Sequence, residues 1–231
     1  SAMVVRRHFL LLAALAPAGP SGAQVRDLND AINKAGRQRM LSQRLVKSYM
    51  ALGQGVRIEQ AETVLAESLA QFDRQLVELR AFAPNSQAKD IYEQLEAAWG
   101  RYKSSLVGAA PSKGGAEAVL VASARVLSLA NDGTTLLETA SGKPSGRIVN
   151  LAGRQRMLSQ RMAATYLAAS WGVQTEASLT AMNAAREEFV KAHGELLRAP
   201  ETTSSIRGEL ELVQQQYGFF DAALKVLNNP D

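Results

Sequence analysis

Cysteine is absent from the 231-residue chain, and histidine occurs only twice, at His8 and His193. The lack of cysteine excludes a disulfide framework, a thiolate nucleophile and a cysteine-ligated metal. Because His8 lies in the amino-terminal segment, His193 is the one histidine left for catalysis or ligation. No nucleophile elbow, phosphate loop or paired-histidine metal motif accompanies it. We therefore predict that the protein is not an enzyme and uses no cofactor and no metal.

Long apolar runs are also lacking, since a transmembrane helix needs about 20 such residues. The run at residues 9–16 is much shorter; it follows Arg6 and Arg7 and precedes a small-residue site at 21–23. This order is typical of a secretory signal peptide, so we predict a signal peptide at 1–23 and a soluble, periplasmic mature protein. Residues 6–10 also resemble a twin-arginine signal, so both export routes stay open. Ser1 and Ala2 resemble a tag remnant, and an ordinary hydrophobic first helix is the alternative.

A strong excess of charge is lacking as well. The chain has 26 basic and 22 acidic residues, a formal charge of +4. Removing Arg6 and Arg7 with the signal peptide leaves 24 basic residues against 22 acidic ones, or +2. So small and evenly spread a surplus does not indicate binding to nucleic acid or to an acidic membrane surface. We expect no nucleic-acid partner and no membrane span.

What the sequence does contain is an internal repeat. Residues 35–44 read Ala-Gly-Arg-Gln-Arg-Met-Leu-Ser-Gln-Arg, and residues 152–161 read the same ten letters. At the same offset of 117, the similarity continues outside the motif and extends over residues 31–107 and 148–224. It includes the identical pairs Asn33/Asn150, Tyr49/Tyr166 and Phe72/Phe189. We therefore infer that the chain arose by tandem duplication.

The remainder of the chain is predicted to be helical. Apolar residues recur at spacings of three and four, as on one face of a helix, and no alternating strand pattern competes. Ser86, Ser112, Thr175 and Thr202 are candidate helix caps. The predicted fold is all-α, an elongated up-down bundle of about seven helices with pseudo-two-fold symmetry. The helices are expected at residues 24–53, 57–82, 86–107, 115–140, 145–171, 175–198 and 203–227.

The fourth predicted helix, 115–140, has no counterpart after the second repeat. Since short connections make consecutive helices antiparallel, this helix returns the chain so that both repeats start in the same direction. The two motif helices are then parallel and can meet across a pseudo-two-fold axis. The predicted organisation is a signal peptide at 1–23, a first repeat at 24–110, a return helix and linker at 111–144, and a second repeat at 145–231.

The motif places hydrogen-bond donors on one helical face, because residues three or four apart are neighbours on a helix. Glycine inside a helix costs about 0.5–1 kcal/mol relative to alanine, so its presence indicates close approach of another backbone. The planar fork of arginine matches a planar oxyanion, and an anion between two facing arginines would cancel their repulsion. We predict a small-oxyanion site with the ligand-binding residues Arg39, Arg156, Gly36, Gly153, Asn33, Asn150, Ser42 and Ser159.

A less specific interpretation is that the motif arginines are solvated helix charges whose aliphatic stems cover the core. We expect this for Arg37 and Arg44, and for Arg154 and Arg161 in the second repeat, because they point away from the glycine face. The ten identical residues stand in a sequence that has otherwise changed between the repeats. This contrast favours a specific role for the remaining pair of arginines.

The string from Ile32 to Arg44, with its partner from Asn150 to Met162, resembles the signature of the PilJ-type domain. That domain is the amino-terminal sensing module of type IV pilus chemotaxis transducers. The motif is also similar to the P-box of NarX-type nitrate/nitrite sensor kinases. The resemblance implies a helical bundle that senses a ligand outside the inner membrane. It further implies that the arginine three residues after the glycine, here Arg39 and Arg156, contacts nitrate or nitrite from both sides of a symmetry axis.

The sequence departs from those sensors in two respects. It shows no transmembrane helix, kinase or methyl-accepting region, so a signal would have to pass to a partner such as a membrane sensor or transporter. Both motifs lie in one chain, which makes an intersubunit site an internal one. The predicted function is exported, soluble binding or sensing of nitrate or nitrite. The alternative is a ligand-free helical interaction module that docks on a membrane receptor or transporter and uses the motif as a close-packed seam.

Overall fold

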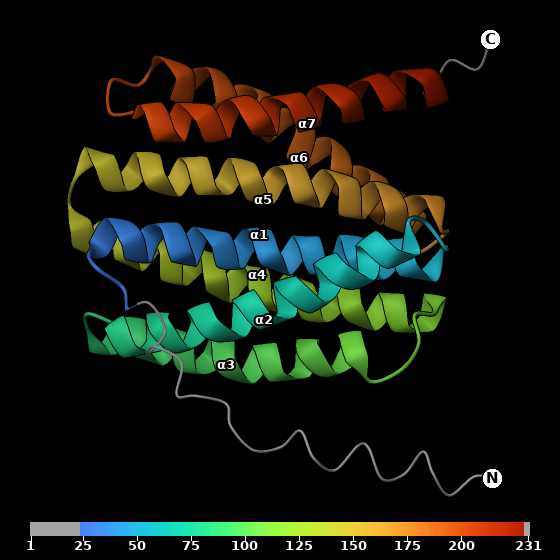
Figure 1. Cartoon of the computed structure of the whole chain (residues 1–231), viewed down its shortest axis with the longest axis horizontal. Coiled ribbons are helices and arrows are strands. Elements are labelled where there is room, and N and C mark those ends of the chain that lie inside the picture. Colours follow the sequence, from blue (N-terminus) through green and yellow to red (C-terminus); the bar gives the residue numbers. More distant parts are fainter. Residues whose placement is uncertain (1–23, 229–231) are drawn as a thin grey trace, which may run out of the picture.

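The computed structural model describes residues 24–228, and within them every regular element is a helix (Figure 1). This confirms the predicted all-α bundle of about seven helices. The predicted signal peptide lies outside the described residues. The helices are α1 (Leu28–Gly53), α2 (Ile58–Phe82), α3 (Ser86–Val107), α4 (Lys113–Ser141), α5 (Pro144–Ser170), α6 (Thr175–Arg198) and α7 (Ser204–Asn228).

Side-chain caps explain where several helices begin. Asp27 accepts a hydrogen bond from the Asp30 amide at 2.8 Å, so α1 begins at Leu28 and not near residue 24. Ser112 accepts from the Gly115 amide at 3.1 Å, as predicted. The predicted cap at Ser86 is wrong, because Asn85 binds the Ala88 amide at 2.9 Å one position earlier.

The other two predicted caps are also wrong. The residue before α6 is Gln174, which has no side-chain capping bond, and Thr175 is already helical. Thr202 is buried and donates to the Leu196 carbonyl at 2.7 Å, while the adjacent Thr203 accepts from the Ile206 amide at 3.2 Å. The predicted elements are right, and their exact ends depend on which of two adjacent polar residues binds the free amides.

The duplication is visible in the backbone as well as in the motif. Arg57 and Gln174, which are 117 positions apart, both adopt left-handed conformations, with φ of 45° and 44°. Two residues earlier, Gly55 and Gly172 have φ of 69° and 77°. Left-handed backbone is uncommon for residues other than glycine, so its recurrence at equivalent turns shows that the two repeats fold alike.

Helices α1 and α5 lie side by side and run in the same direction (Figure 1). Near their first turns Asn29 Nδ2 donates to Ser145 Oγ at 3.5 Å. Near their last turns Gln54 Nε2 donates to the Leu167 carbonyl at 2.8 Å. The two helices are therefore level at both ends, which confirms the predicted parallel arrangement.

The two halves of the bundle are covered differently. Helix α4 packs against α1 and α3, so α1 is enclosed by α2, α4 and α5. Among the described residues no eighth helix repeats this role, and α7 packs directly against α5. The main core accordingly lies in the first half, where Phe72, Tyr92 and Tyr102 are buried, and the second half has smaller clusters. No helix within residues 24–228 is long and apolar enough to cross a membrane.

Candidate functional site

The two motif glycines lie against each other where α1 and α5 pack together. A Cβ atom added to Gly36 would lie 3.4 Å from the Cα of Gly153, and one added to Gly153 would lie 3.3 Å from the Cα of Gly36. Each added Cβ would also lie 3.3 Å from Nη2 of Arg39. The glycines thus let the two backbones cross at the height of the motif and leave room for a guanidinium group beside them.

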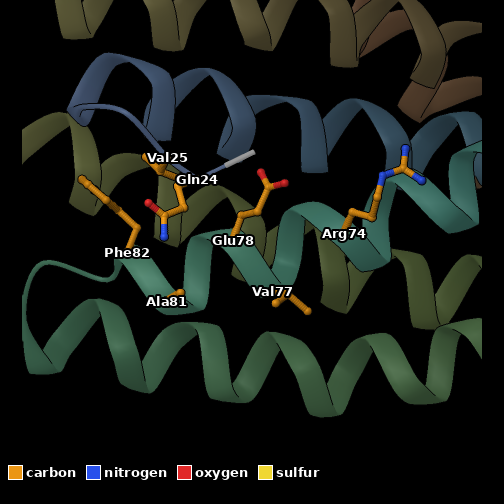
Figure 2. Close-up of a pocket in the computed structure, with 7 residues that line it drawn as sticks. All are labelled: Gln24, Val25, Arg74, Val77, Glu78, Ala81 and Phe82. Atoms are coloured by element: carbon orange, nitrogen blue, oxygen red, sulfur yellow. The ribbon is translucent and has the colours of Figure 1, made fainter. Parts of the chain in front are cut away.

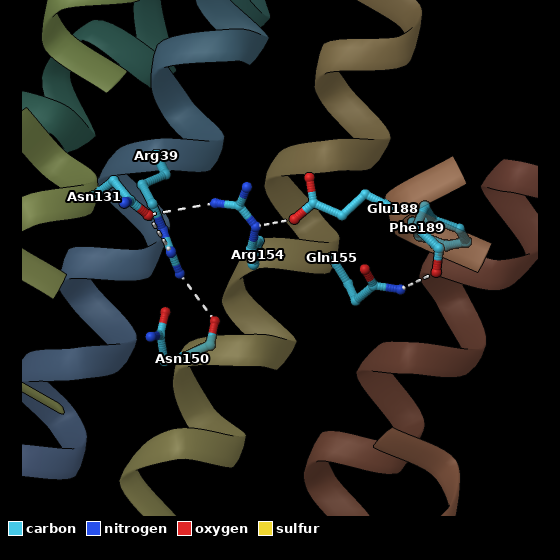
Figure 3. Close-up of polar contacts among 7 residues, drawn as sticks. All are labelled: Arg39, Asn131, Asn150, Arg154, Gln155, Glu188 and Phe189. Atoms are coloured by element: carbon cyan, nitrogen blue, oxygen red, sulfur yellow. Dashed lines mark hydrogen bonds and ion pairs between the residues drawn. The ribbon is translucent and has the colours of Figure 1, made fainter. Parts of the chain in front are cut away.

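Arg39 lies at this crossing with only 1% of its surface exposed. Its Nη1 donates to Asn131 Oδ1 at 3.1 Å, and its Nη2 donates to the Asn150 carbonyl at 2.9 Å (Figure 3). Its Nε is buried and has no acceptor among the described residues. No carboxylate in the described part of the chain forms an ion pair with it. Arg39 is therefore a buried cation held only by neutral oxygens.

Arg156 occupies the equivalent position in the second repeat and reaches back across the crossing. Its Nη2 donates to Asn33 Oδ1 at 2.8 Å, and its Nη1 contacts Glu209 Oε2 of α7 at 3.1 Å. Its side chain is 16% exposed, and its Nε, like that of Arg39, is buried without an acceptor. Each motif arginine thus donates to the asparagine of the other repeat, but Arg39 binds the backbone carbonyl of Asn150 and Arg156 binds the side chain of Asn33, so the two-fold symmetry is approximate.

The electrostatics of the two arginines follow from this placement. Burial, together with the charges of Arg154 and Arg156, lowers the pKa of Arg39 to about 9, although Tyr92 and Glu138 act in the opposite direction. Burial also lowers the pKa of Arg156, which Glu209 partly offsets. A cation with a lowered pKa binds its proton more weakly in the folded state than in the unfolded chain. At neutral pH the charge on Arg39 therefore destabilises the fold.

Helix α4 contributes two residues that the repeat comparison did not indicate. Asn131 Oδ1 accepts from Arg39 at 3.1 Å and also from Nη1 of Arg154 at 3.4 Å (Figure 3). Glu138 accepts a hydrogen bond from Nδ2 of Asn150. The expectation that Arg154 points away from the site is wrong, since it shares an acceptor with Arg39 and is also ion-paired with Glu188.

Arg39, Arg154 and Arg156 form an arginine cluster at the crossing. The two motif serines lie outside this arginine cluster. Ser42 is buried, and its hydroxyl donates to the Arg39 carbonyl of its own helix at 2.7 Å. The Ser159 hydroxyl donates to Gln216 Oε1 at 3.4 Å, on the side facing α7. The structure therefore brings together six of the eight predicted site residues: Gly36, Gly153, Arg39, Arg156, Asn33 and Asn150.

Part of the motif ties helices together. Gln38 Nε2 donates to the Phe72 carbonyl at 3.2 Å. In the second repeat, as Figure 3 shows, Gln155 Nε2 donates to the Phe189 carbonyl at 2.9 Å. These four residues are related by the offset of 117, so the same bond joins the motif helix to the following helix in each repeat. A structural requirement therefore accounts for the repeated glutamine.

Three further observations concern other kinds of site. No group of three or more His, Cys, Asp or Glu side chains that could hold a metal ion occurs between residues 24 and 228. His193 stacks on Phe189 with ring centroids 5.7 Å apart, and burial lowers its pKa. A cavity of about 500 Å³ lies away from the motif, between Gln24–Val25 and α2 (Figure 2). Its Glu78 is ion-paired with Lys34 at 2.6 Å.

Chemically, the crossing offers positive charge and hydrogen-bond donors whose present acceptors are amide oxygens and, at Arg156, the carboxylate of Glu209. Hydrogen bonds to anionic oxygens are roughly twice as strong as those between neutral groups. An anion could therefore replace Asn131 or Asn33 at the arginines and could engage the unused Nε atoms.

One family model matches the chain, described as "PilJ: Type IV pili methyl-accepting chemotaxis transducer N-term". It matches twice, over residues 23–127 and 138–231. Each match contains one copy of the ten-residue motif, and the first extends into α4. No curated protein and no solved structure matches the chain.

Proposed function

The chain belongs to the PilJ family of chemotaxis-transducer N-terminal domains, and from this membership we propose that it is an exported sensing protein that binds a small oxyanion between α1 and α5. Domains of this family are the sensing modules of their transducers. The ligand would lie beside Gly36 and Gly153, bound by Arg39 and Arg156 with help from Asn33 and Asn150. The signal would pass in the periplasm to a partner protein, such as a membrane sensor or transporter.

The observation that carries this proposal is the buried, unpaired charge of Arg39. An arginine that is 1% exposed would ordinarily be paired with a carboxylate, because an isolated buried charge is strongly unfavourable. Here its hydrogen-bond acceptors are amide oxygens and two further arginines lie near it, while the nearby carboxylate of Glu138 is hydrogen-bonded to Asn150 and not to Arg39. A bound anion would supply the missing negative charge and would relieve the mutual repulsion of three guanidinium groups.

Nitrate and nitrite are the ligands we propose, on the basis of the motif's likeness to the P-box of nitrate/nitrite sensors. Both anions are planar, and a guanidinium group can donate two parallel hydrogen bonds to one edge of such an ion. The unused Nε atoms of Arg39 and Arg156 are the donors available for this.

A thermal-shift panel tests the proposal. A ligand that binds only the folded state, at a hundredfold excess over Kd, stabilises it by about 2.7 kcal/mol, a rise in melting temperature on the order of 5–10 °C for a chain of this size. We expect such a rise with nitrate or nitrite and none with chloride at the same ionic strength.

Variants locate the site. Arg39→Ala and Arg156→Ala should each remove most of the nitrate shift, and Arg39→Met should do the same while retaining an apolar stem. Arg37→Ala is the matched control, because Arg37 belongs to the same motif but makes no hydrogen bond or ion pair with any described residue. Equal losses for Arg37→Ala and Arg39→Ala would show that the anion binds elsewhere.

A ligand-free interaction module is the second candidate. The observation that favours it is that all four Nη atoms of Arg39 and Arg156 already have protein acceptors. In that case α1 and α5 would form a permanent seam, and the bundle would dock on a membrane receptor or transporter. A flat response to the whole panel of small oxyanions, in a protein that melts cooperatively, would favour this function.

A further inference from the structure

A second cavity of about 420 Å³ lies between α4, α5 and α6. This volume is within the range of about 300–1,000 Å³ that is typical of small-molecule sites. One part of its wall is polar and includes Asn131, Arg154 and Arg161. Another part is apolar and includes Leu127 and Leu158, the latter only 2% exposed. The cavity thus combines a cationic end with an apolar surface, and it reaches the arginine cluster through Asn131.

Comparison of the repeats shows how the cavity arises. The α6 residues on its wall are Glu188 and three alanines, Ala181, Ala184 and Ala185. The residues 117 positions before the three alanines, on α2, are Val64, Glu67 and Ser68. Three larger or charged side chains of the first repeat are therefore alanines in the second. The space left by the smaller side chains lies against α5, beside Arg154 and Arg161 of the second motif.

The two repeats carry the nearby carboxylate at different positions. In the first repeat Glu67 lies close enough to Arg44 to oppose the lowering of its pKa by burial. The equivalent pair in the second repeat is Ala184 and Arg161, and the carboxylate is found instead at Glu188, where the first repeat has Gln71. Glu188 is the one acidic residue on the cavity wall, and it is ion-paired with Arg154.

Arg161 therefore has little to balance its charge. It makes a single long contact, from Nη1 to Gln43 Oε1 at 3.5 Å, and no ion pair within the described residues. Burial and the nearby charge of Arg154 lower the pKa of Arg161, while Glu188 acts against them. Two guanidinium groups thus share one carboxylate at the polar end of a partly apolar cavity.

We propose that this cavity binds a small amphipathic carboxylate, whose charged group pairs with Arg161 and Arg154 and whose hydrocarbon part lies against Leu127, Met157 and Leu158. The ligand carboxylate would lie near Arg161, as Glu67 lies near Arg44 in the first repeat. This site is separate from the oxyanion site at the glycine crossing, and it does not depend on that proposal. Because Asn131 hydrogen-bonds both Arg154 and Arg39, occupancy of one site can alter the other.

A chain-length series, measured by isothermal titration calorimetry, tests the chemistry. Each buried methylene contributes about 0.8 kcal/mol, or nearly a fourfold gain in affinity. From acetate through butanoate to hexanoate, affinity should therefore rise by about fourfold per added carbon. Hexan-1-ol and hexylammonium should bind at least tenfold more weakly than hexanoate, because they lack the negative charge. Equal binding of acetate and hexanoate, or of hexanol and hexanoate, would overturn the proposal, as would no saturable binding of hexanoate.

Variants at Ala184 test the location. Ala184→Glu restores the residue of the first repeat, which would neutralise Arg161 and repel the ligand; we expect hexanoate affinity to fall at least tenfold more than in the similar-sized Ala184→Gln. Ala66→Glu, at an exposed position on α2, adds the same charge away from the cavity and should leave binding unchanged. If Ala184→Glu binds hexanoate as the unmodified protein does, the proposal is wrong.

The two sites can be told apart by the same set of proteins. Arg39→Met should lose the nitrate shift and keep hexanoate binding within a few-fold, whereas Ala184→Glu should lose hexanoate binding and keep a nitrate response. Failure of nitrate with a normal hexanoate series would overturn the oxyanion function alone. A normal nitrate response with no hexanoate binding would overturn the cavity proposal alone.

Discussion

Two opposing effects act on the motif glycines, and the structure shows which one prevails. Within a helix, alanine is more favourable than glycine by about 0.5–1 kcal/mol. At Gly36 and Gly153, however, a Cβ would lie 3.3–3.4 Å from the facing Cα atom and 3.3 Å from the Arg39 guanidinium. Backbone atoms cannot move aside as a flexible side chain can. Steric crowding should therefore outweigh the gain in helix propensity.

We predict that Gly36→Ala and Gly153→Ala each lower the free energy of unfolding, by about 1–3 kcal/mol as for other overpacked positions. Urea denaturation followed by circular dichroism measures this. Gly100→Ala is the control, because a Cβ on Gly100 of α3 meets no atom within 4 Å. That variant should be stabilised by up to about 1 kcal/mol. Similar stabilisation of all three variants would show that α1 and α5 are not packed closely at the motif.

The motif residues could be predicted from sequence because each occurs twice. Identity at Arg39 and Arg156, and at the two asparagines, marks positions that both repeats need. The role of Arg154 could not be found in this way. The offset of 117 makes Arg154 equivalent to Arg37, but only Arg154 faces α4 and binds Asn131. The symmetry fails at this position because the second repeat has no helix equivalent to α4 among the described residues.

At the scale of elements, α4 was predicted only as a return helix. The structure gives it a second role, because Asn131 and Glu138 enter the arginine cluster and Leu127 lines the adjacent cavity. No sequence comparison within the chain could indicate these residues, since α4 has no repeated counterpart. Helix bounds, in contrast, were predictable to within a few residues from breaks such as Pro84 and Gly142.

The position of Asn131 allows a bound anion to be imitated. In Asn131→Asp, a carboxylate would replace the amide oxygen that now accepts from Arg39 and Arg154. Hydrogen bonds to charged groups contribute about 1.5–3 kcal/mol, against about 1 for neutral pairs, and desolvation of the new carboxylate offsets part of the gain. We predict that this variant melts at a higher temperature than the unmodified protein without ligand, and that nitrate no longer raises it.

A control separates this effect from a general change in charge. Ala118 lies more than three helical turns before Asn131 on α4 and is exposed, so Ala118→Asp adds a carboxylate on the same helix outside the cluster. It should retain the nitrate shift and gain little stability. A full nitrate shift in Asn131→Asp would mean that the anion does not bind at Arg39.

At the scale of the whole molecule, the duplication gives two halves that differ in how extensively their helices are packed and buried. In the first half, α1 is enclosed by α2, α4 and α5, and aromatic side chains such as Tyr102 are fully buried. In the second half, α7 packs against α5. It meets α6 through the stacked rings of Tyr217 and Phe189, 4.8 Å apart, and through the ion pair of Arg186 with Asp221. Regions with few buried contacts open at lower free energy than the core.

Native-state hydrogen exchange should therefore resolve an order of opening. We predict that amides of α7 exchange first, and that α1 and α4 exchange only with global unfolding. Nitrate should slow exchange in α1 and α5, whose crossing it would hold together, and should leave the local opening of α7 largely unchanged. In Arg39→Met the added protection should disappear while the order of opening remains. If α7 exchanged as slowly as α1, the unequal covering of the halves would have no energetic consequence. If nitrate protected α7 alone, its site would lie at the α5–α7 contact, and not at the glycine crossing.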